Sequence, residues 1–341
     1  MVNEPVIVSI ITPTFNHADF IAECIQSALD QTFTNWEMLI VNDGSTDRTA
    51  EIAARFAAAD PRITLFNQQN IGIFRLAESY NFALQHAKGE YITILEGDDI
   101  WESDKLSRQV TALESNPSAV MAWSSARQVN IDQSQVYMVF PELKPSDVKL
   151  FTNNPVGSFL DILLFRNCIP ALTACIRKEA LEKISGFQQG YGLPLVDLPT
   201  WQLLSTQGTF FYDAVPTGRW RVYPGQTTKT HLVKIFSGFY ALSLDNFRKF
   251  SSDPTLSFSA IQKDIKIHFD KVMIMAYARE GRYLLIKKLY KEARKRYVKA
   301  IFSKGGEYVW KLRALVGLFL SLFHLDVEGL AKLLNRPNYK N

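Results

Sequence analysis

The strongest constraint in this sequence is the regular alternation of apolar β-branched runs with segments of helical periodicity over the first hundred residues. Residues 6–12 form one such run, ended by Pro13, which is typical of a strand buried on both faces of a parallel sheet. A helical pattern follows Asp19, and residues 36–41 form a second apolar run. The pattern then repeats, with strands expected at 62–66 and 91–95 and helices expected at 76–87 and after Thr46 or Asp47. This order predicts the α/β class, with an open, mainly parallel sheet, right-handed crossovers and flanking helices.

The character of the chain changes toward its C-terminal end. A helix is expected over 105–115, a strand over 120–129 and an exposed loop over 144–154. From about residue 237 onward, the sequence has helical patterns only, together with a basic stretch. At 341 residues the chain exceeds what one hydrophobic core usually supports. We therefore expect an α/β domain over 1–236, with halves 1–104 and 105–236, and an all-helical C-terminal region over 237–341.

Composition limits where the protein works and what it binds. With 38 Lys and Arg against 34 Asp and Glu, the net charge of +4 is too small to argue for nucleic acid. Three cysteines without a C-x-x-C pair favour a reducing compartment, and the first residues lack the pattern of a signal peptide. The longest apolar stretch, residues 314–325, would be about 18 Å long as a helix, which is too short to span a bilayer. We expect a cytoplasmic protein that is soluble or peripheral to the membrane.

Polar loops follow three of the expected strands. They comprise residues 12–16, 42–47 and 96–99. Ligands of open α/β sheets bind beyond the carboxyl ends of the strands, so these loops are expected to converge on one crevice.

The last of these loops, Glu96-Gly97-Asp98-Asp99, places three carboxylates within four residues. Their mutual repulsion favours a divalent cation, Mn²⁺ or Mg²⁺, which binds hard oxygen ligands together with diphosphate oxygens. The alternative is an acidic, solvated turn that precedes the next helix.

The second loop, Asn42-Asp43-Gly44-Ser45, offers a carboxylate, a flexible glycine and backbone N–H groups. These groups suit the base and ribose of a nucleotide, while the alternative is an Asx turn with a helix cap. The acidic loop on the same sheet edge favours nucleotide binding. The chain has neither a G-x-G-x-x-G motif after the first strand nor a P-loop, which argues against those two types of site.

A family resemblance becomes visible when the motifs are read together. The motifs are S-I-I-T-P-T-F-N (9–16), V-N-D-G-S-T-D (41–47), N-I-G (70–72) with Asn81, G-E-Y-I-T-I-L-E-G-D-D-I-W (89–101), D-K-L (104–106), G-F (186–187), V-D-L-P-T-W (196–201) and R-W-R-V-Y-P-G-Q (219–226). In order and spacing this set resembles the family 2 glycosyltransferases of GT-A fold, over roughly two thirds of the chain. The set is specific for the family and poorly specific for the sugar.

The resemblance implies a binding site for a nucleotide-sugar donor in the first half of the domain and for an acceptor in the second. The nucleotide would be held by the first two loops, through Thr12, Pro13, Thr14, Asn16, Asp43 and Gly44. Asp98 would lie near the ribose and the metal, and Asp99 would be the main ligand of the cation. Glu96 replaces the usual first aspartate of the motif and is not expected to bind the cation directly.

The resemblance also implies a catalytic base. The family uses an acid in a short E-D motif, which here reads Val196-Asp197, so Asp197 is the candidate base. Its alternative role is that of a helix N-cap. Tyr223 stands where relatives often have a histidine, which leaves Arg219 and Arg221 as candidate diphosphate contacts.

The implied enzyme is a metal-dependent, inverting glycosyltransferase. It would move a sugar from a nucleotide-diphosphate donor, expected to be a UDP-sugar, to a hydroxyl of a glycan or lipid-linked acceptor in surface polysaccharide biosynthesis. The alternative, suggested by Val196 and Tyr223, is a catalytically impaired nucleotide-sugar-binding protein. A nucleotidyltransferase would need a glycine-rich, basic loop after the first strand, and residues 12–16 do not provide one.

The C-terminal region allows two interpretations. Residues 309–323, preceded by the basic stretch, could lie in the plane of a membrane with cations near anionic headgroups. Alternatively, the apolar faces pack on each other or on a second subunit, and the charges are simply solvated. The sequence favours packing.

Overall fold

The computed structural model describes residues 6–142, 144–223, 226 and 231–325. Parts of the sequence predictions therefore lie outside the described residues, namely the signal-peptide argument at 1–5, Pro224 and Gly225 of the last motif, and the final segment 326–341. The chain forms two compact units. Unit 1 comprises 1–189, 195–222 and 251–259, and unit 2 comprises 190–194, 223–250 and 260–341. This division falls between Val222 and Tyr223, earlier in the chain than the expected boundary at residue 237.

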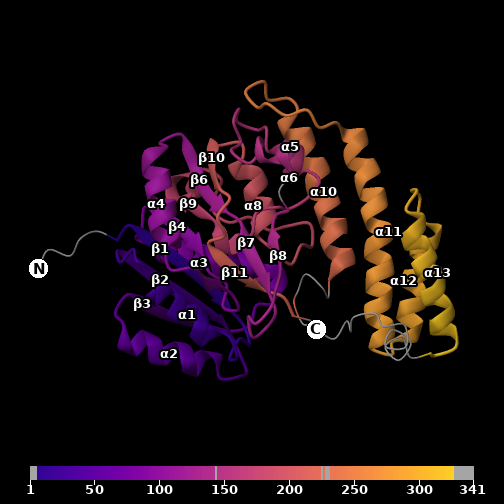
Figure 1. The fold of residues 1–341 in the computed structure, drawn as a ribbon, viewed down its shortest axis with the longest axis horizontal. Coiled ribbons are helices and arrows are strands. Elements are labelled where there is room, and N and C mark those ends of the chain that lie inside the picture. Colours follow the sequence, from indigo (N-terminus) through magenta and orange to yellow (C-terminus); the bar gives the residue numbers. More distant parts are fainter. Residues whose placement is uncertain (1–5, 143, 224–225, 227–230, 326–341) are drawn as a thin grey trace, which may run out of the picture. The chain divides into compact units, whose positions relative to one another are not determined.

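Unit 1 is built on a seven-stranded, mainly parallel sheet (Figure 1). The strand order is β10-β6-β9-β4-β1-β2-β3, and β9 is the antiparallel member. The strands are β1 (Val8–Thr14), β2 (Trp36–Asp43), β3 (Ile63–Gln68), β4 (Tyr91–Ile94), β6 (Ala119–Ser124), β9 (Cys175–Arg177) and β10 (Thr209–Asp213). The predicted α/β class with an open, mainly parallel sheet is confirmed.

The interior position of β1 explains its β-branched composition. It pairs in parallel with β2 on one side and β4 on the other, and all seven of its residues are buried. Pro13 lies inside this strand, aligned with Val41, although the sequence predicted that the proline ends it. The proline fits because β4 pairs with β1 only as far as Ile11, and the Pro13 carbonyl still accepts a hydrogen bond from Gly97 N at 3.2 Å.

Four helices of unit 1 follow the predicted order. They are α1 (Ile21–Leu29), α2 (Thr49–Ala59), α3 (Leu76–His86) and α4 (Lys105–Ser115), and the short helix η1 (Ile73–Arg75) precedes α3. Ile21, Cys24 and Ile25 of α1 are fully buried in the core beside the sheet. Asp19 does not cap α1, because Phe20 occupies that position, whereas Asp47 Oδ1 accepts from Thr49 N at 2.9 Å at the start of α2.

A second sheet, absent from the sequence prediction, lies beside the acidic loop. It has the order β5-β11-β7-β8, with β5 (Ile100–Trp101), β7 (Ala126–Val129), β8 (Val136–Phe140) and β11 (Gly218–Arg221). The single strand expected over 120–129 is therefore wrong: the chain leaves the first sheet after Ser124 and enters the second at Ala126. Residues 121–126 are buried without a break across this step, so the burial pattern does not reveal the change of partners.

Most described residues of the segment 144–154 are exposed, as expected, but the segment is not wholly a loop and not wholly exposed. It contains the short helix α5 (Pro145–Val148), and both Phe151 and Asn153 are fully buried. The Asn153 amide donates to Ser205 O and Gly208 O, which satisfies these carbonyls inside the unit. The remaining helices of unit 1 are α6 (Leu160–Leu163), η2 (Ala171–Thr173), α7 (Lys178–Lys183) and α8 (Asp197–Leu204).

Unit 2 is helical. Its helices are α10 (Leu232–Phe250), α11 (Gln262–Ile286), α12 (Tyr290–Phe302) and α13 (Tyr308–Leu322). The helical region thus begins at Leu232, before the expected residue 237. None of the described helices is both long enough and apolar enough to cross a bilayer.

Candidate functional site

The first two polar loops are joined by hydrogen bonds. Asn16 N donates to Ser45 Oγ at 2.9 Å, and Thr46 N donates to Asn16 Oδ1 at 2.8 Å. Asn16 has a φ of 54°, a left-handed conformation that asparagine tolerates better than most residues. The loops after β1 and β2 therefore form one continuous surface at the carboxyl edge of the sheet, as the sequence predicted.

Asp43 organises the loop that follows β3. Its Oδ1 accepts from Ile71 N at 2.9 Å and its Oδ2 accepts from Gly72 N at 3.1 Å. The Gln68 amide also donates to Asp43 Oδ1, at 2.8 Å. The carboxylate thus holds a neighbouring backbone segment in place, a contact that the sequence did not reveal.

The backbone conformation and the neighbouring atoms at position 44 require a glycine. Its φ is +67°, and an added Cβ would lie 2.6 Å from Asn70 N. Both the left-handed backbone and the close approach of Asn70 exclude a side chain here.

The acidic loop also lies close to the loop that follows β1. A Cβ on Gly97 would lie 2.5 Å from Thr14 Oγ1 and 2.7 Å from His17 Nδ1. Thr14 and His17 are themselves joined by a hydrogen bond of 3.2 Å. Thr12 is fully buried, and its Oγ1 has no hydrogen-bond partner among the described residues.

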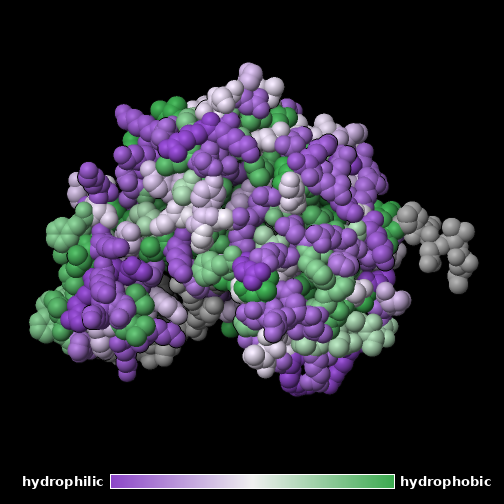
Figure 2. All heavy atoms as spheres, turned by 180° about the vertical axis from the view of Figure 1, so that it is seen from behind, coloured by the Kyte–Doolittle hydropathy of each residue, from purple (hydrophilic) through white to green (hydrophobic). Residues whose placement is uncertain are grey.

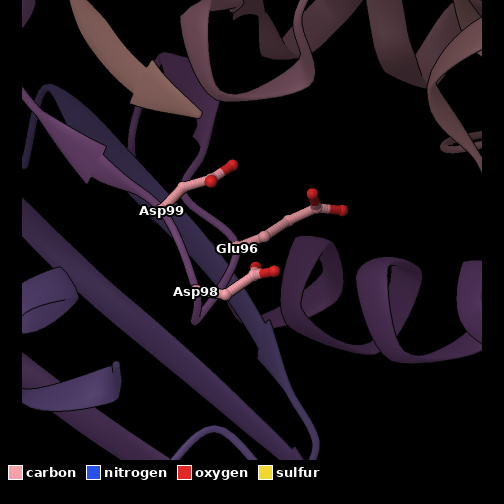
Figure 3. A group of neighbouring side chains, drawn as sticks. All are labelled: Glu96, Asp98 and Asp99. Atoms are coloured by element: carbon pink, nitrogen blue, oxygen red, sulfur yellow. The ribbon is translucent and has the colours of Figure 1, made fainter. Parts of the chain in front are cut away.

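The three acids of the loop form a cluster (Figure 3). One carboxylate oxygen from each of Glu96, Asp98 and Asp99 lies within 4.8 Å of the others. Burial raises the pKa of Glu96 to about 7, with a further contribution from Asp98, and Tyr80 donates to Glu96 Oε1 at 2.8 Å. Burial and the charge of Asp98 also raise the pKa of Asp99. The ionised carboxylates therefore repel one another in a poorly solvated position.

This donor set fits a divalent cation. Carboxylate oxygens are the ligands that Mg²⁺ and Mn²⁺ prefer, and a bound cation would remove the repulsion that raises the pKa values of Glu96 and Asp99. All three carboxylates point to the same side of the loop in Figure 3. Glu96 was expected to stand apart from the cation, yet its oxygen lies as close to the group as those of the two aspartates.

Arg221 is fixed from several directions in unit 1. Its backbone N–H donates to Asp99 Oδ1 at 3.1 Å, and its guanidinium donates to Asp98 O at 2.8 Å and to Ile131 O at 3.3 Å. A further guanidinium bond reaches Glu23, and the side chain is only 1% exposed. These bonds fix the acidic loop onto β11.

Arg219 lies on the second sheet. It forms a two-bond ion pair with Glu102, at 3.0 Å for each bond, and donates to Gln133 at 2.9 Å. Arg127 shares the same glutamate at 2.9 Å. These residues line a cavity of about 350 Å³ to which none of the three clustered acids contributes.

Asp197 is the first residue of α8, directly after Val196, and within the described chain α8 has no side-chain cap hydrogen bond. Burial raises the pKa of Asp197, and a hydrogen bond from Asn167 Nδ2 to its Oδ2, at 2.5 Å, acts in the opposite direction. Its other oxygen, Oδ1, is buried without a hydrogen-bond partner among the described residues. The charge of Asp197 also raises the pKa values of Glu96 and Tyr80, so Asp197 lies within electrostatic range of the acidic cluster.

The sequence reasoning missed Tyr80 and Asn167. Tyr80 is fully buried on α3 at a position that helical spacing assigns to the core. Asn167 lies between α6 and η2 in a segment with no distinguishing motif, and only the fold brings it to Asp197. No pattern in a single sequence marks either residue as part of the site.

The open, mainly parallel sheet, with polar loops and an acidic cluster at its carboxyl edge, is the arrangement of the GT-A class of nucleotide-sugar transferase folds. The profile of glycosyl transferase family 2 matches residues 9–182, about half of the chain. The chain belongs to this family.

Individual relatives agree with the family assignment. The chain is 40% identical over 111 residues to the putative teichuronic acid biosynthesis glycosyltransferase TuaG of Bacillus subtilis, a match covering 32% of this chain and 43% of TuaG. The chain therefore matches less than half of the length of that relative.

Solved structures share the fold. Staphylococcus aureus TarS (residues 1–349), in complex with UDP-GlcNAc, superimposes with a TM-score of 0.57 at 13% identity, over 97% of this chain and 92% of TarS. The mannosyltransferase PcManGT of Pyrobaculum calidifontis, in complex with GDP-Man and Mn²⁺, gives a TM-score of 0.54 at 17% identity, over 98% and 89%.

Proposed function

We propose that this chain is a metal-dependent, inverting glycosyltransferase that moves a sugar from a nucleotide-diphosphate donor to an acceptor hydroxyl. The observation that carries this proposal is the cluster of Glu96, Asp98 and Asp99 at the carboxyl edge of the sheet, within electrostatic range of Asp197. The relatives support a nucleotide-sugar donor, because TarS is solved with UDP-GlcNAc and PcManGT with GDP-Man. We infer a UDP-sugar from the likeness to TarS.

The donor nucleotide occupies the surface formed by the first two loops. Thr12, Pro13, Thr14, Asn16 and Gly44 contact it through side chains and backbone, with Asp43 holding the adjoining loop. Asp98 and Asp99 would hold Mn²⁺ or Mg²⁺, together with Glu96. The positive charge held there would stabilise the negative charge of the departing diphosphate.

Asp197 acts as the general base. Its Oδ1, buried without a described partner, is available to accept the proton of the acceptor hydroxyl, while Asn167 holds Oδ2. A raised pKa makes the carboxylate a stronger base. The hydroxyl attacks the anomeric carbon from the side opposite the diphosphate. The configuration at that carbon is therefore inverted.

The two arginines have different roles in this proposal. Arg221 positions Asp98 and Asp99 through the bonds described above, and its guanidinium is also the proposed contact of the diphosphate. Arg219 lies on the second sheet beside Glu102, and it contacts an anionic group of the donor or of the acceptor.

The acceptor in this proposal is a glycan or a lipid-linked glycan of surface polysaccharide biosynthesis, in line with the role that the name of TuaG gives to that protein. The reaction takes place in the cytoplasm or at the cytoplasmic face of a membrane. Unit 1 carries the catalytic residues, and its division near residue 104 separates the donor side from the acceptor side.

A second candidate is a protein that binds nucleotide-sugars with impaired catalysis. Val196 and Tyr223, which replace an acid and a histidine common in relatives, favour it. The substitution Asp197→Asn separates the two: the enzyme loses at least about 100-fold in acceptor-dependent turnover and keeps donor binding. Unchanged turnover removes Asp197 from the mechanism.

The main test measures thermal stabilisation by nucleoside diphosphates with and without Mn²⁺. We expect UDP to raise the melting temperature of the wild type only when Mn²⁺ is present, and Asp99→Asn to abolish this effect. Asp253→Asn serves as the control, because Asp253 is a carboxylate outside the cluster that bonds to Thr255. Equal stabilisation of wild type and Asp99→Asn contradicts the metal assignment.

A further inference from the structure

Helix α13 packs inward through its small residues. Ala314, Gly317 and Ser321 are buried, and a Cβ on Gly317 would lie 2.3 Å from Tyr297 Cζ of α12. Ala314 and Tyr297 belong to the same buried cluster of unit 2. The helix therefore gives its smallest side chains to its own unit.

Most large apolar side chains of α13 are exposed, while Trp310, Leu318 and Leu320 are partly buried against its own unit. Phe319 is 56% exposed and Leu312 is 62% exposed. Together with their neighbours they recur at spacings of three and four residues, so they share one face of the helix. This apolar face consists of Tyr308, Val309, Leu312, Leu315, Val316, Phe319, Leu322 and Phe323, all exposed. In Figure 2, hydrophobic side chains gather on the surface of the helical unit, at the left of the view.

This arrangement is the reverse of an ordinary amphipathic helix, which buries its large apolar residues and exposes polar ones. Single exposed apolar side chains are common, but a contiguous strip marks a surface that meets another apolar phase or partner. The sequence favoured packing of the apolar faces on each other or on a second subunit. Within the described residues, α13 packs on α12 and α11 through its small residues and through Trp310, Leu318 and Leu320, which leaves the exposed apolar face uncovered.

Charge indicates what covers the apolar face. Between residues 287 and 325 the sequence has ten Lys and Arg residues against two Glu residues. At about 100° per residue, Lys311 lies at one border of the apolar face and Arg313 at the other. Exposed lysines on α12 add to this charge at positions 291, 295 and 299.

We propose that the apolar face of α13 inserts into the surface of a lipid bilayer that carries anionic headgroups. The helix lies in the plane of the interface, the apolar face enters the acyl boundary, and the flanking cations contact the headgroups. A second copy of the chain fits less well, because an isologous contact would bring two strongly basic surfaces together. This inference rests on unit 2 alone and is independent of the proposed enzyme activity.

The test uses co-sedimentation of the full chain with vesicles. One set of vesicles contains phosphatidylcholine alone, and the other contains equal amounts of phosphatidylcholine and phosphatidylglycerol. The variant Leu312→Glu with Phe319→Glu places two charges on the apolar face without touching the buried side of α13. Val215→Glu with Ile261→Glu is the control, since these residues are 47% and 51% exposed and the change in net charge is the same.

We expect the wild type and the control to sediment with the anionic vesicles, and less with phosphatidylcholine alone or at high salt. The α13 variant is expected to lose on the order of 10-fold or more in partitioning, with an unchanged melting temperature. The proposal is overturned if the wild type does not bind anionic vesicles, or if the α13 variant binds them as well as the control. A wild-type dimer in light scattering that the α13 variant abolishes, without vesicle binding, would assign the face to a second copy instead.

Discussion

At the scale of single residues, the pair formed by Asn167 and Asp197 defines how the candidate base is held. Asn167 Oδ1 accepts from Ile169 N at 3.2 Å, which fixes the amide so that its Nδ2 points at Asp197. The pKa of Asp197 is thus the balance between burial, which raises it, and the backbone N–H of Leu198 together with the Asn167 amide, which lower it.

Asn167→Ala removes the lowering contribution of the amide and is expected to raise the pKa of Asp197 further. Because the base must be deprotonated to act, the acidic limb of the pH profile of kcat moves to higher pH, and kcat falls roughly 10-fold or more through lost orientation. The measurement is the pH dependence of sugar transfer. Asn130→Ala is a matched control, since Asn130 donates to Asp132 in the same way at 2.6 Å outside the cluster. An unmoved limb would show that Asn167 does not tune Asp197.

Gly44 offers a second prediction at this scale. Gly44→Ala is expected to cost about 1–2 kcal/mol for the left-handed backbone alone, plus the clash with Asn70 N, and to weaken nucleotide binding by on the order of 10-fold. Gly192→Ala is the matched control, because Gly192 has a φ of +68° and no atom within 4 Å of the added Cβ. Denaturant unfolding and nucleotide titration measure the two effects. Equal losses in both variants would mean that the contact with Asn70 has no consequence.

At the scale of elements, helix α4 places the side chain of a lysine in the core. Lys105 is 0% exposed, and its Nζ donates to Thr93 Oγ1 at 2.7 Å and to Gln109 Oε1 at 2.6 Å. The amine also lies 4.2 Å from the centre of the Trp101 ring. Burial lowers the pKa of Lys105 to about 7, since the charged form loses its hydration.

This pKa shift gives stability a definite pH dependence. Between the folded pKa of about 7 and the unfolded pKa of about 10.4, the unfolded chain binds more protons at Lys105, so stability rises with pH. We expect the free energy of unfolding to gain about 2–3 kcal/mol from this residue between roughly pH 7 and pH 9. We expect Lys105→Met to lose this increase of the free energy of unfolding with pH. The control Lys88→Met keeps the increase, because the Lys88 side chain is 75% exposed. Parallel slopes for wild type and Lys105→Met in urea unfolding would refute the prediction.

At the scale of the whole molecule, the chain is two compact units with different content. Unit 1 holds the sheets and every candidate catalytic residue, and unit 2 holds α10 to α13 with the apolar face. Each unit has a buried apolar cluster: one surrounds β1, β2 and α1, and another joins α11, α12 and α13.

Because each unit has a buried cluster of its own, we predict that the two units respond separately to ligand. In calorimetry we expect UDP with Mn²⁺ to raise the transition of unit 1, by about 2.7 kcal/mol at a ligand concentration 100 times Kd, and to leave the transition of unit 2 unchanged. Leu312→Glu with Phe319→Glu should leave the ligand response intact. A single transition that moves as a whole would show that the two units unfold together.

The sequence by itself determined the α/β class, the positions of the first four strands and the acidic loop. These follow from local rules: β-branched runs form buried strands, helical spacing forms their crossovers, and residues at strand ends share one edge. The parts that only the tertiary structure decided depend on pairing between distant residues. They include the second sheet entered after Ser124, the buried segment around Phe151 and the contact of Asn167 with Asp197. The outward orientation of α13 belongs with them, because a helical pattern shows that one face is apolar and does not show which face its neighbours cover.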